Sequence, residues 1–199
     1  MSEKNRPSFF ERIFAFVLLI GLWPLLLIIA ITIRILDGKP IIFSQERVGY
    51  RGQLFIIYKF RTLRNECSKF NKVTIRSRSD PRLTRFGSFM RKSSIDELLQ
   101  LWNVVRGEMK FVGPRPDMPW AHSTYDPLHW FSKICYYPGL TGWWQVEEKG
   151  ITAINDPKVI QLDIKSGEDG KSIWKSSRLI ILTPFSILRR MRSNSLISI

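Results

Sequence analysis

An uncharged stretch from residue 13 to residue 33 is the feature that most limits what this chain can fold into. A helix needs about 20 apolar residues to cross the hydrocarbon core of a bilayer, and this stretch reaches that length. No small-residue cleavage site follows it, since the chain continues directly into Arg34-Ile-Leu-Asp37, so we do not interpret it as a cleaved signal peptide. We therefore expect the stretch to lie in a lipid bilayer.

Pro24 stands near the middle of this stretch, where it removes one backbone hydrogen bond and bends the helix. A bent helix can cross the membrane with a kink, or it can return to the side from which it entered. Positive charge favours the cytoplasmic side of a membrane. Basic residues occur on both flanks of the stretch: Lys4, Arg6, Arg12, Arg34 and Lys39. This symmetry suits a re-entrant helix-break-helix, and a kinked spanning helix is the alternative.

The charge of the chain indicates an anionic partner. Lys and Arg total 31 against 17 Asp and Glu, which gives a formal net charge of +14. The partner can be nucleic acid, an anionic membrane surface or a phosphorylated substrate. Cys67 and Cys135 belong to no Cys-x-x-Cys or Cys/His cluster, so we expect neither a zinc site nor a redox motif, and a reducing, cytoplasm-facing domain.

The length of 199 residues allows one domain with a core and is too short for two ordinary ones. We expect residues 1–39 to form the membrane-embedded helix, and residues 40–199 to form a compact, mostly helical cytoplasm-facing domain of the α+β class. Runs of β-branched and aromatic residues at 40–43 and 54–58 predict a short β-hairpin, and residues 110–112 predict another strand.

Other segments give coarser expectations. Residues 64–82 are polar and charged, which is typical of an exposed loop, and residues 85–90 predict a short helix. Residues 178–192 combine an apolar body with basic ends. This pattern predicts either an amphipathic helix in the membrane interface or a packed C-terminal helix broken near Pro184.

The clearest helix begins at Ser93 or Ser94, because apolar residues then recur at helical spacing until Gly107. Asp96 and Glu97 occupy its first turn, where either serine can form a capping arrangement with the acid three residues further on. The helix dipole favours negative charge there and should keep Asp96 ionised. Asp96 is therefore a candidate nucleophile and Glu97 a candidate metal ligand. Acids that only cap the helix are the alternative.

Several cations could bind phosphate near these acids. The prolines on either side of Arg115 fix its backbone, so its guanidinium can be held ready for a bidentate phosphate contact. His122 and His129 are isolated from any partner nucleophile, and we interpret both as structural. The candidate phosphate-binding residues are Lys59, Arg61, Arg91 and Arg115.

Ordered sequence motifs carry a family resemblance. They are Gln45-Glu-Arg-Val-Gly49, Tyr58-Lys-Phe-Arg-Thr62, Asp80-Pro-Arg-Leu-Thr84, Ser94-Ile-Asp-Glu-Leu98, Gln100-Leu-Trp-Asn-Val104, Arg106-Gly107, Val112-Gly-Pro-Arg-Pro116 and Pro138-Gly-Leu-Thr-Gly-Trp143. Between about residues 9 and 163, the chain resembles the small monotopic phosphoglycosyl transferases, also called bacterial sugar transferases. Six or more motifs in the same order make a chance resemblance very improbable.

The resemblance implies an enzyme of the bacterial cytoplasmic membrane with its catalytic domain on the cytoplasmic face. Such enzymes transfer a sugar-1-phosphate from a UDP-sugar to polyprenyl (undecaprenyl) phosphate and release UMP, which initiates polysaccharide or glycoconjugate assembly. The N-terminal helix of the family is re-entrant, which favours the hairpin topology. The sequence does not reveal which sugar is transferred or whether the chain forms a homodimer.

The resemblance also implies roles for particular residues. By that likeness, Asp96 attacks the β-phosphorus of the donor and carries the phosphosugar, while Glu97 helps to hold Mg²⁺. The residues that it implies for phosphate binding and the active site are Lys59, Arg91, Arg115 and Asp163.

The chain departs from the family pattern at three places. Trp23 replaces the serine that precedes the helix-breaking proline, residues 147–150 carry acid where the family carries a basic residue, and residues 164–177 follow the family poorly. These departures keep open an inactive, membrane-anchored scaffold of the same fold. A nucleic-acid-binding module explains the charge and the interleaved aromatic residues. It does not explain the apolar stretch or the Asp96-Glu97 pair, so we expect no nucleic-acid partner.

Overall fold

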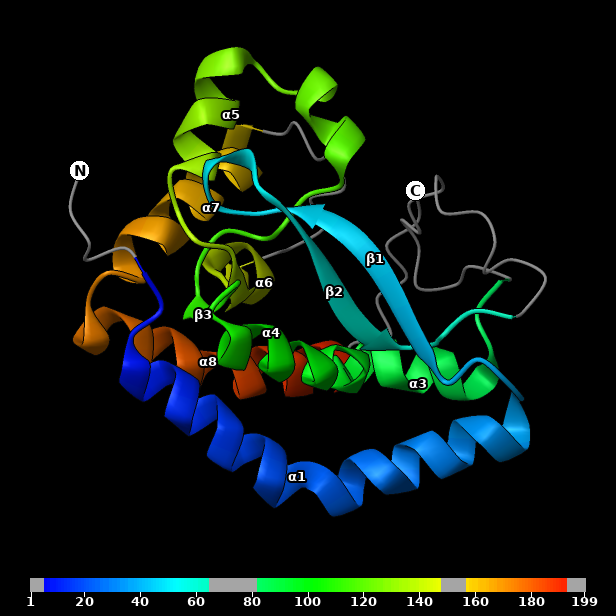
Figure 1. The fold of residues 1–199 in the computed structure, drawn as a ribbon. Coiled ribbons are helices and arrows are strands. Elements are labelled where there is room, and N and C mark those ends of the chain that lie inside the picture. Colours follow the sequence, from blue (N-terminus) through cyan, green and yellow to red (C-terminus); the bar gives the residue numbers. More distant parts are fainter. Residues whose placement is uncertain (1–5, 65–81, 148–156, 193–199) are drawn as a thin grey trace.

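The computed structural model describes residues 6–64, 82–147 and 157–192. Within these ranges the chain combines helices with two small β-sheets, which agrees with the predicted α+β class (Figure 1). The elements, with η for a 3₁₀ helix, are α1 (Phe9–Leu36), β1 (Ile42–Val48), η2 (Tyr50–Gly52), β2 (Leu54–Phe60), α3 (Arg85–Ser93), η3 (Ile95–Gln100), α4 (Leu101–Arg106), β3 (Lys110–Val112), η4 (Pro119–Thr124), α5 (Pro127–Ile134), β4 (Gly139–Thr141), α6 (Trp143–Glu147), α7 (Pro157–Asp169) and α8 (Ile173–Arg192).

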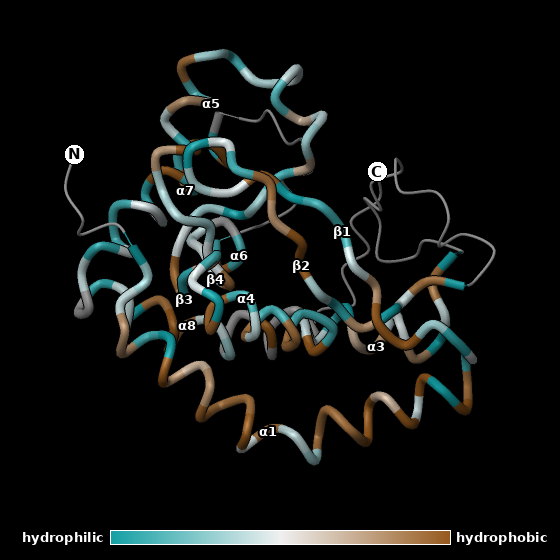
Figure 2. Tube along the Cα trace, viewed as in Figure 1, coloured by the Kyte–Doolittle hydropathy of each residue, from teal (hydrophilic) through white to brown (hydrophobic). Residues whose placement is uncertain are grey.

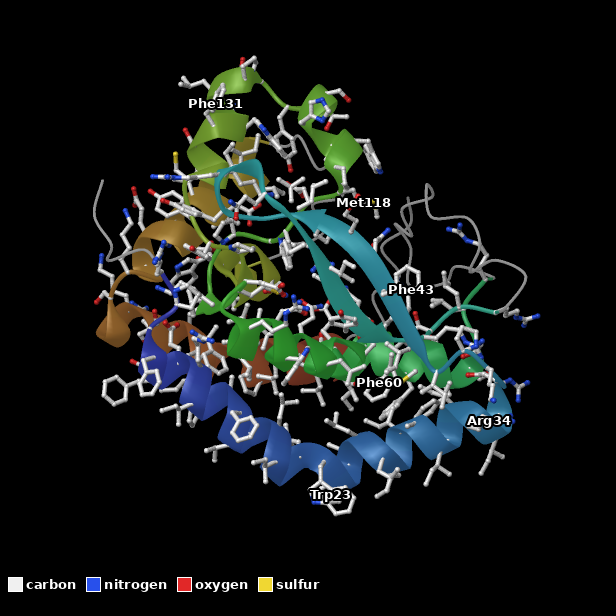
Figure 3. The ribbon with its side chains drawn as sticks, in the orientation of Figure 1. Trp23, Arg34, Phe43, Phe60, Met118 and Phe131 are labelled. Atoms are coloured by element: carbon white, nitrogen blue, oxygen red, sulfur yellow. The ribbon has the colours of Figure 1, made fainter. Side chains whose placement is uncertain are left out.

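Helix α1 contains the apolar stretch and extends beyond it at both ends. Ser8 caps it, because its Oγ accepts a hydrogen bond from the amide of Glu11 at 3.1 Å and the Glu11 carboxylate accepts one from the amide of Ser8 at 2.8 Å. Figure 1 shows two arms of α1 that meet at an angle, and Figure 3 places Trp23 at the bend, next to Pro24. The predicted helix-break-helix is corrected to one bent helix, because the proline deforms the hydrogen-bond ladder without ending the helix.

Both ends of α1 are bonded to the rest of the protein. Near the N-terminal end, Nε of Arg12 donates a hydrogen bond to the carbonyl of Val105 at 2.8 Å. Just beyond the C-terminal end, Arg61 donates to the carbonyls of Asp37 at 2.6 Å and Gly38 at 3.0 Å. The two arms therefore begin and end against the same body of the protein (Figure 1).

Most of α1 lies outside the protein core. Of its residues, Ala15, Ile29 and Ile33 are buried, while Figure 2 shows apolar residues along most of its length. By length and hydropathy, α1 is the one helix in the described part of the chain that could cross a membrane. Its many exposed apolar side chains require an apolar environment outside this chain.

The predicted hairpin is confirmed, and its strands are longer than the sequence patterns indicated. Strands β1 and β2 pair antiparallel, with Phe43 opposite Lys59 and Arg47 opposite Phe55. Directly opposed residues point to the same face of a sheet, and that face alternates along each strand. Arg47 and Lys59 therefore lie on one face of the hairpin, together with the buried side chain of Ile57.

The helix that the sequence predicts from Ser93 or Ser94 to Gly107 is helical throughout, but it starts differently. Helix α3 runs into Ser94, which has the left-handed backbone (φ 56°), and the chain continues as η3 and then α4. Neither serine caps the helical turn that carries the acids. The Ser93 hydroxyl donates to the carbonyls of Phe89 and Met90 in α3, and the Ser94 side chain makes no capping hydrogen bond. Gly107 ends α4 with a φ of 79°, as predicted.

The C-terminal elements complete the core. Strand β3 matches its predicted bounds and pairs in parallel with β4. Helix α8 is continuous through Pro184, so the predicted break there is wrong: Pro184 sits on the exposed side, while Leu179 is fully buried. The buried residues of the main core are Ala15, Ile57, Leu101, Val104, Met109, Phe111, Val112, Trp143 and Leu179. This core joins α1, the hairpin, α4, β3 and α8.

Most of the predicted exposed loop 64–82 lies outside the described residues. Its two ends are held together, because the amide of Arg64 donates to the carbonyl of Arg82 at 2.9 Å. Cys67 also lies outside the described ranges, and Cys135 is an exposed free thiol.

Candidate active site

Asp96 and Glu97 lie in the first turn of η3, directly after the left-handed residue Ser94. A non-glycine residue with positive φ is uncommon and costs free energy, so such residues gather where a turn must aim functional side chains. Here the turn from α3 into η3 brings the two acids against the hairpin. Asp96 is only 4% exposed.

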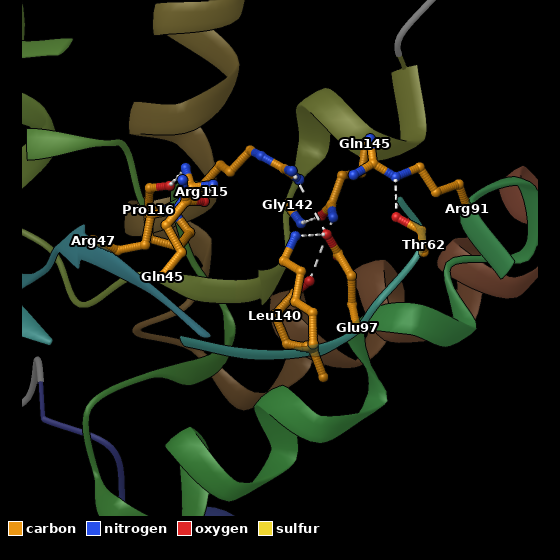
Figure 4. Close-up of polar contacts among 11 residues, drawn as sticks. Gln45, Arg47, Thr62, Arg91, Glu97, Arg115, Pro116, Leu140, Gly142 and Gln145 are labelled. Carbon is orange, nitrogen blue, oxygen red and sulfur yellow. Dashed lines mark hydrogen bonds and ion pairs between the residues drawn. The ribbon is translucent and has the colours of Figure 1, made fainter. Parts of the chain in front are cut away.

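Glu97 is the better paired of the two acids. Nζ of Lys59 lies 2.6 Å from its Oε1, and Nη2 of Arg115 lies 3.6 Å from the same oxygen (Figure 4). Burial alone would raise the pKa of Glu97, but the charges of Lys59 and Arg115 outweigh burial and lower it to about 2. Glu97 is therefore ionised over the whole physiological range.

Asp96 has the opposite environment. Burial, followed by the neighbouring charge of Glu97, raises the pKa of Asp96 from its usual 3.8 to about 6. Asp96 is therefore still mostly ionised at pH 7, as predicted, but desolvation outweighs the helix end and holds its pKa above the usual value. No described residue forms an ion pair with Asp96. Two adjacent acids whose pKa values are pushed apart are typical of sites in which the two carboxylates have different roles.

The structure brings Arg91 and Lys59 to the same place. Arg91 lies in the last turn of α3, and its Nε donates to the hydroxyl of Thr62 at 3.0 Å (Figure 4). Its charge lowers the pKa of both Asp96 and Glu97, which places it beside the pair. Burial lowers the pKa of Lys59, while the carboxylate of Glu97 opposes this shift.

Arg61 does not belong to this site. Its guanidinium is 2% exposed and donates to the backbone carbonyls of Asp37 and Gly38 after α1. The sequence prediction that Arg61 binds phosphate is therefore corrected. Strand β2 ends at Phe60, so Lys59 points from the strand to Glu97, whereas Arg61 follows the strand and its side chain reaches the carbonyls after α1.

Asp163 contacts the backbone of Arg115. The Asp163 carboxylate accepts a hydrogen bond from the amide of Arg115 at 3.1 Å and pairs with Nζ of Lys133 at 2.7 Å. Lys133 also pairs with Asp117 at 2.5 Å. Burial would lower the pKa of Lys133, but Asp163 and Asp117 outweigh burial and raise it. Asp163 is thus a positioning residue for the segment that carries Arg115.

Sequence reasoning missed Lys133 and Asp117. Lys133 lies in α5 and is buried, with its ammonium between two carboxylates. The only available signal was Asp117 directly after the Pro114-Arg115-Pro116 motif. His122 and His129 lie in η4 and α5, outside the acid and cation cluster.

An open pocket of about 250 Å³ connects these groups. Its lining residues are Arg47, Ile57, Lys59, Glu97, Gln100, Arg115, Pro116, Gly139, Leu140 and Gln145. Asp96 is not among them, so it lies beside the pocket rather than on its wall. Gly139 brings the backbones close together: a Cβ there would lie 2.1 Å from the amide nitrogen of Gly113.

The described residues contain no cluster of three or more side chains able to hold a metal ion. A metal here would have to use one or two carboxylates and oxygens of a bound ligand, which is the way Mg²⁺ is commonly held. Glu97 suits this requirement because it is ionised and lines the pocket. Asp96 and Glu97 have pKa values shifted in opposite directions, and the cations around them are Lys59, Arg91 and Arg115. Such a site is suited to phosphoryl transfer.

Comparisons with known proteins agree with this chemistry. The profile of the family described as bacterial sugar transferase matches residues 4–190. The chain is 38% identical over 183 residues to the UDP-glucose:undecaprenyl-phosphate glucose-1-phosphate transferase of Xanthomonas campestris pv. campestris, a match that covers 89% of this chain and 38% of that protein. It is 36% identical over 182 residues to the undecaprenyl-phosphate glucose phosphotransferase of Komagataeibacter xylinus, with 87% and 34% covered.

A shorter relative is the exopolysaccharide production protein ExoY of Sinorhizobium fredii, which is 38% identical over 151 residues, with 69% of this chain and 66% of ExoY covered. The chain therefore belongs to the bacterial sugar transferase family. It spans a little over a third of the length of the first two relatives. The family match continues through residues 164–177, where the sequence motifs had suggested a departure.

Proposed function

We propose that this protein transfers a sugar-1-phosphate from a UDP-sugar to polyprenyl phosphate and releases UMP. The name of the Xanthomonas relative describes such a transfer of glucose-1-phosphate from UDP-glucose to undecaprenyl phosphate. The observation that carries the proposal is the acid pair. Asp96 is buried with a raised pKa, and Glu97 beside it is ionised and paired with Lys59 and Arg115. This arrangement places one reactive carboxylate among cations that can neutralise a diphosphate.

The reaction has two steps. The Asp96 carboxylate attacks the β-phosphorus of the donor, forms an acyl phosphate with the phosphosugar, and the bond to the bridging oxygen breaks so that UMP leaves with the electron pair. An oxygen of polyprenyl phosphate then attacks the same phosphorus, which releases Asp96 as a carboxylate and forms the diphosphate-linked sugar lipid. Arg91 and Arg115 stabilise the charge on the transferred group.

Glu97, together with oxygens of the donor diphosphate, would hold Mg²⁺ as a cofactor at this site. When bound, it neutralises negative charge on the diphosphate. Nζ of Lys59 bonds to one Glu97 oxygen, Oε1. The second carboxylate oxygen is suited to a cation at the pocket.

The bent shape of α1 supports a re-entrant placement in the cytoplasmic leaflet of the bacterial inner membrane. Both ends of α1 are bonded to the same body, so the catalytic part lies on the side from which the helix enters. Helices α3, α4 and α8 form a layer next to α1 (Figure 1). Exposed apolar side chains on this layer suit contact with the interface: Phe89, Trp102, Ile180 and Ile181.

The test is UMP release by the purified protein in detergent or nanodiscs, with Mg²⁺, polyprenyl phosphate and a panel of UDP-sugars. The proposal expects release from at least one UDP-sugar. If none of the UDP-sugars gives UMP, the result would favour an inactive scaffold. Tight, salt-dependent oligonucleotide binding without any UMP release would favour the nucleic-acid alternative.

A further inference from the structure

Arg47 is a cation that lines the pocket but takes no part in the proposed reaction. It lies near the end of β1, and its side chain lines the pocket together with Lys59, Glu97 and Arg115. In Figure 4 it reaches toward Pro116 and lies close to Arg115. Arg47 is therefore part of the same cavity as the acid pair.

One buried nitrogen of Arg47 makes no hydrogen bond to the described residues. Nη1 donates to the carbonyl of Pro116 at 3.2 Å, and Nη2 donates to the side chain of Gln45 at 2.6 Å. Its Nε is buried and has no hydrogen-bond partner among the described residues. A buried unpaired donor is costly unless a ligand or water completes its bonding.

Two like charges also face each other here. Burial is the main cause that lowers the pKa of Arg47 to about 10, and the charge of Arg115 adds to it, against the opposing charges of Asp117 and Glu97. The fold thus holds two guanidinium groups close together in one cavity. An anionic ligand between them would relieve this repulsion, and guanidinium groups match phosphate geometry well.

The position of Arg47 along the hairpin indicates which phosphate it meets. Arg47 stands opposite Phe55, four residues along β1 from Phe43, the partner of Lys59. Four residues of strand span roughly 13 Å. The positive charges that act on Asp96 are those of Lys59, Arg91 and Arg115, and Arg47 is not among them, although Glu97 does act on Arg47. Arg47 therefore lies at the end of the pocket away from Asp96.

We propose that Arg47 binds the phosphate that stays with the nucleoside, the α-phosphate of the donor and of the departing UMP. This inference rests on the proposed function. In an in-line displacement the leaving oxygen lies on the side of the attacked phosphorus opposite the nucleophile. A guanidinium at the far end of the pocket is placed to stabilise the charge that develops on that leaving group.

The experiment compares Arg47→Gln with the wild-type protein, and Arg51→Gln serves as a matched control. Arg51 lies in the turn that joins β1 to β2. It is exposed and stacks on Tyr50 outside the pocket. Binding of uridine, UMP and UDP is measured by ligand-observed NMR, and UMP and UDP also by calorimetry. We expect Arg47→Gln to weaken UMP and UDP by the same factor, about tenfold or more, to leave uridine unchanged, and to reduce the salt dependence of UMP binding. Arg51→Gln should bind all three as the wild type does.

Two results would overturn the inference. Equal weakening of uridine, UMP and UDP would mean that Arg47 only supports the backbone of Pro116. A loss confined to UDP would assign Arg47 to the β-phosphate. If Arg47→Gln lowers the melting temperature strongly, Arg47→Lys keeps a cation at this position and should weaken UMP and UDP equally but by a smaller factor. Wild-type protein that binds UMP yet releases none from any UDP-sugar contradicts the proposed function and leaves the Arg47 comparison interpretable.

Discussion

Nζ of Lys59 lies 2.6 Å from Oε1 of Glu97, and this ion pair joins strand β2 to the turn that follows α3. Both side chains are largely buried, so the removal of either partner would leave an unpaired buried charge, which is costly. The same pair engages Glu97 and leaves its neighbour Asp96 without an ion-pair partner among the described residues. One carboxylate thus organises the site while the other is available to react.

Replacing Asp96 with asparagine should separate stability from activity. The folded-state pKa of Asp96 is raised, so the folded protein binds its proton more tightly than the unfolded chain, and stability falls as pH rises from about 4 to about 6. Asp96→Asn removes this cost and should increase the free energy of unfolding at pH 7.5 by about 1 to 3 kcal/mol. UMP release should fall by about 10³ or more, a barrier increase of roughly 4 kcal/mol. Chemical denaturation measures the free energy of unfolding, and UMP assays measure the rate. A less stable Asp96→Asn protein would contradict the claim that the ionised Asp96 carboxylate destabilises the fold.

Replacing Glu97 with glutamine should affect both metal dependence and stability. The folded-state pKa of Glu97 is depressed, so its ion pairs contribute stability above pH 4.5 that is lost as pH falls toward 2. Glu97→Gln leaves Lys59 buried without its counter-ion, and we expect a loss of about 3 kcal/mol at pH 7. The Mg²⁺ concentration for half-maximal rate should rise and turnover should slow. An unchanged Mg²⁺ titration at reduced stability would restrict Glu97 to the structural pair.

Replacing Lys133 with methionine should destabilise the protein around the segment that carries Arg115. The change leaves Asp117 and Asp163 buried without their shared cation, which costs about 3 to 5 kcal/mol. Lys175→Met is the matched control, because Lys175 pairs with Asp169 at 3.4 Å while its side chain is 67% exposed. Lys175 is in solvent, and its largely buried partner Asp169 keeps the hydrogen bond that it accepts from Nε1 of Trp143, so we expect the loss of this pair to cost about 0 to 1 kcal/mol. Equal melting temperatures for the two variants would contradict the role of the Lys133 network.

The re-entrant placement of α1 predicts that both of its flanks face the cytoplasm. Single cysteines at Arg6 and Lys39, in a background without Cys67 and Cys135, should both be protected from an impermeant thiol reagent in intact cells. Both should react after the membrane is permeabilised, which is the internal control. Labelling of the cysteine at position 6 alone in intact cells would show that α1 spans the membrane.

The hairpin, β3 and the end of α4 at Gly107 could be predicted because each depends on a local signal: β-branched runs for the strands, and a glycine that accepts positive φ for the helix end. The start of η3 could not. Ser94 adopts a φ of 56°, and a serine in that conformation has no sequence signature. The serines were therefore interpreted as caps.

The site was predictable where motifs name its residues and unpredictable where tertiary packing decides. Lys59 and Arg115 lie beside the acid pair, as predicted, while Arg61 follows the end of β2 and bonds to the backbone after α1, which no motif indicates. Lys133 meets Asp163 across two helices that are distant in sequence, and no local pattern indicates such a pair. The raised pKa of Asp96 likewise depends on burial, which the local sequence does not determine.

The most direct test of the central claim is to incubate the protein with a UDP-sugar and Mg²⁺ without any lipid acceptor. If Asp96 forms a covalent phosphosugar, the protein releases about one UMP per active site and then stops. Mass spectrometry then finds a phosphosugar on the peptide that contains Asp96, and Asp96→Asn shows neither the burst nor the adduct. No UMP without acceptor, together with an unmodified protein and intersecting initial-rate lines, would contradict the account and indicate direct transfer within a ternary complex.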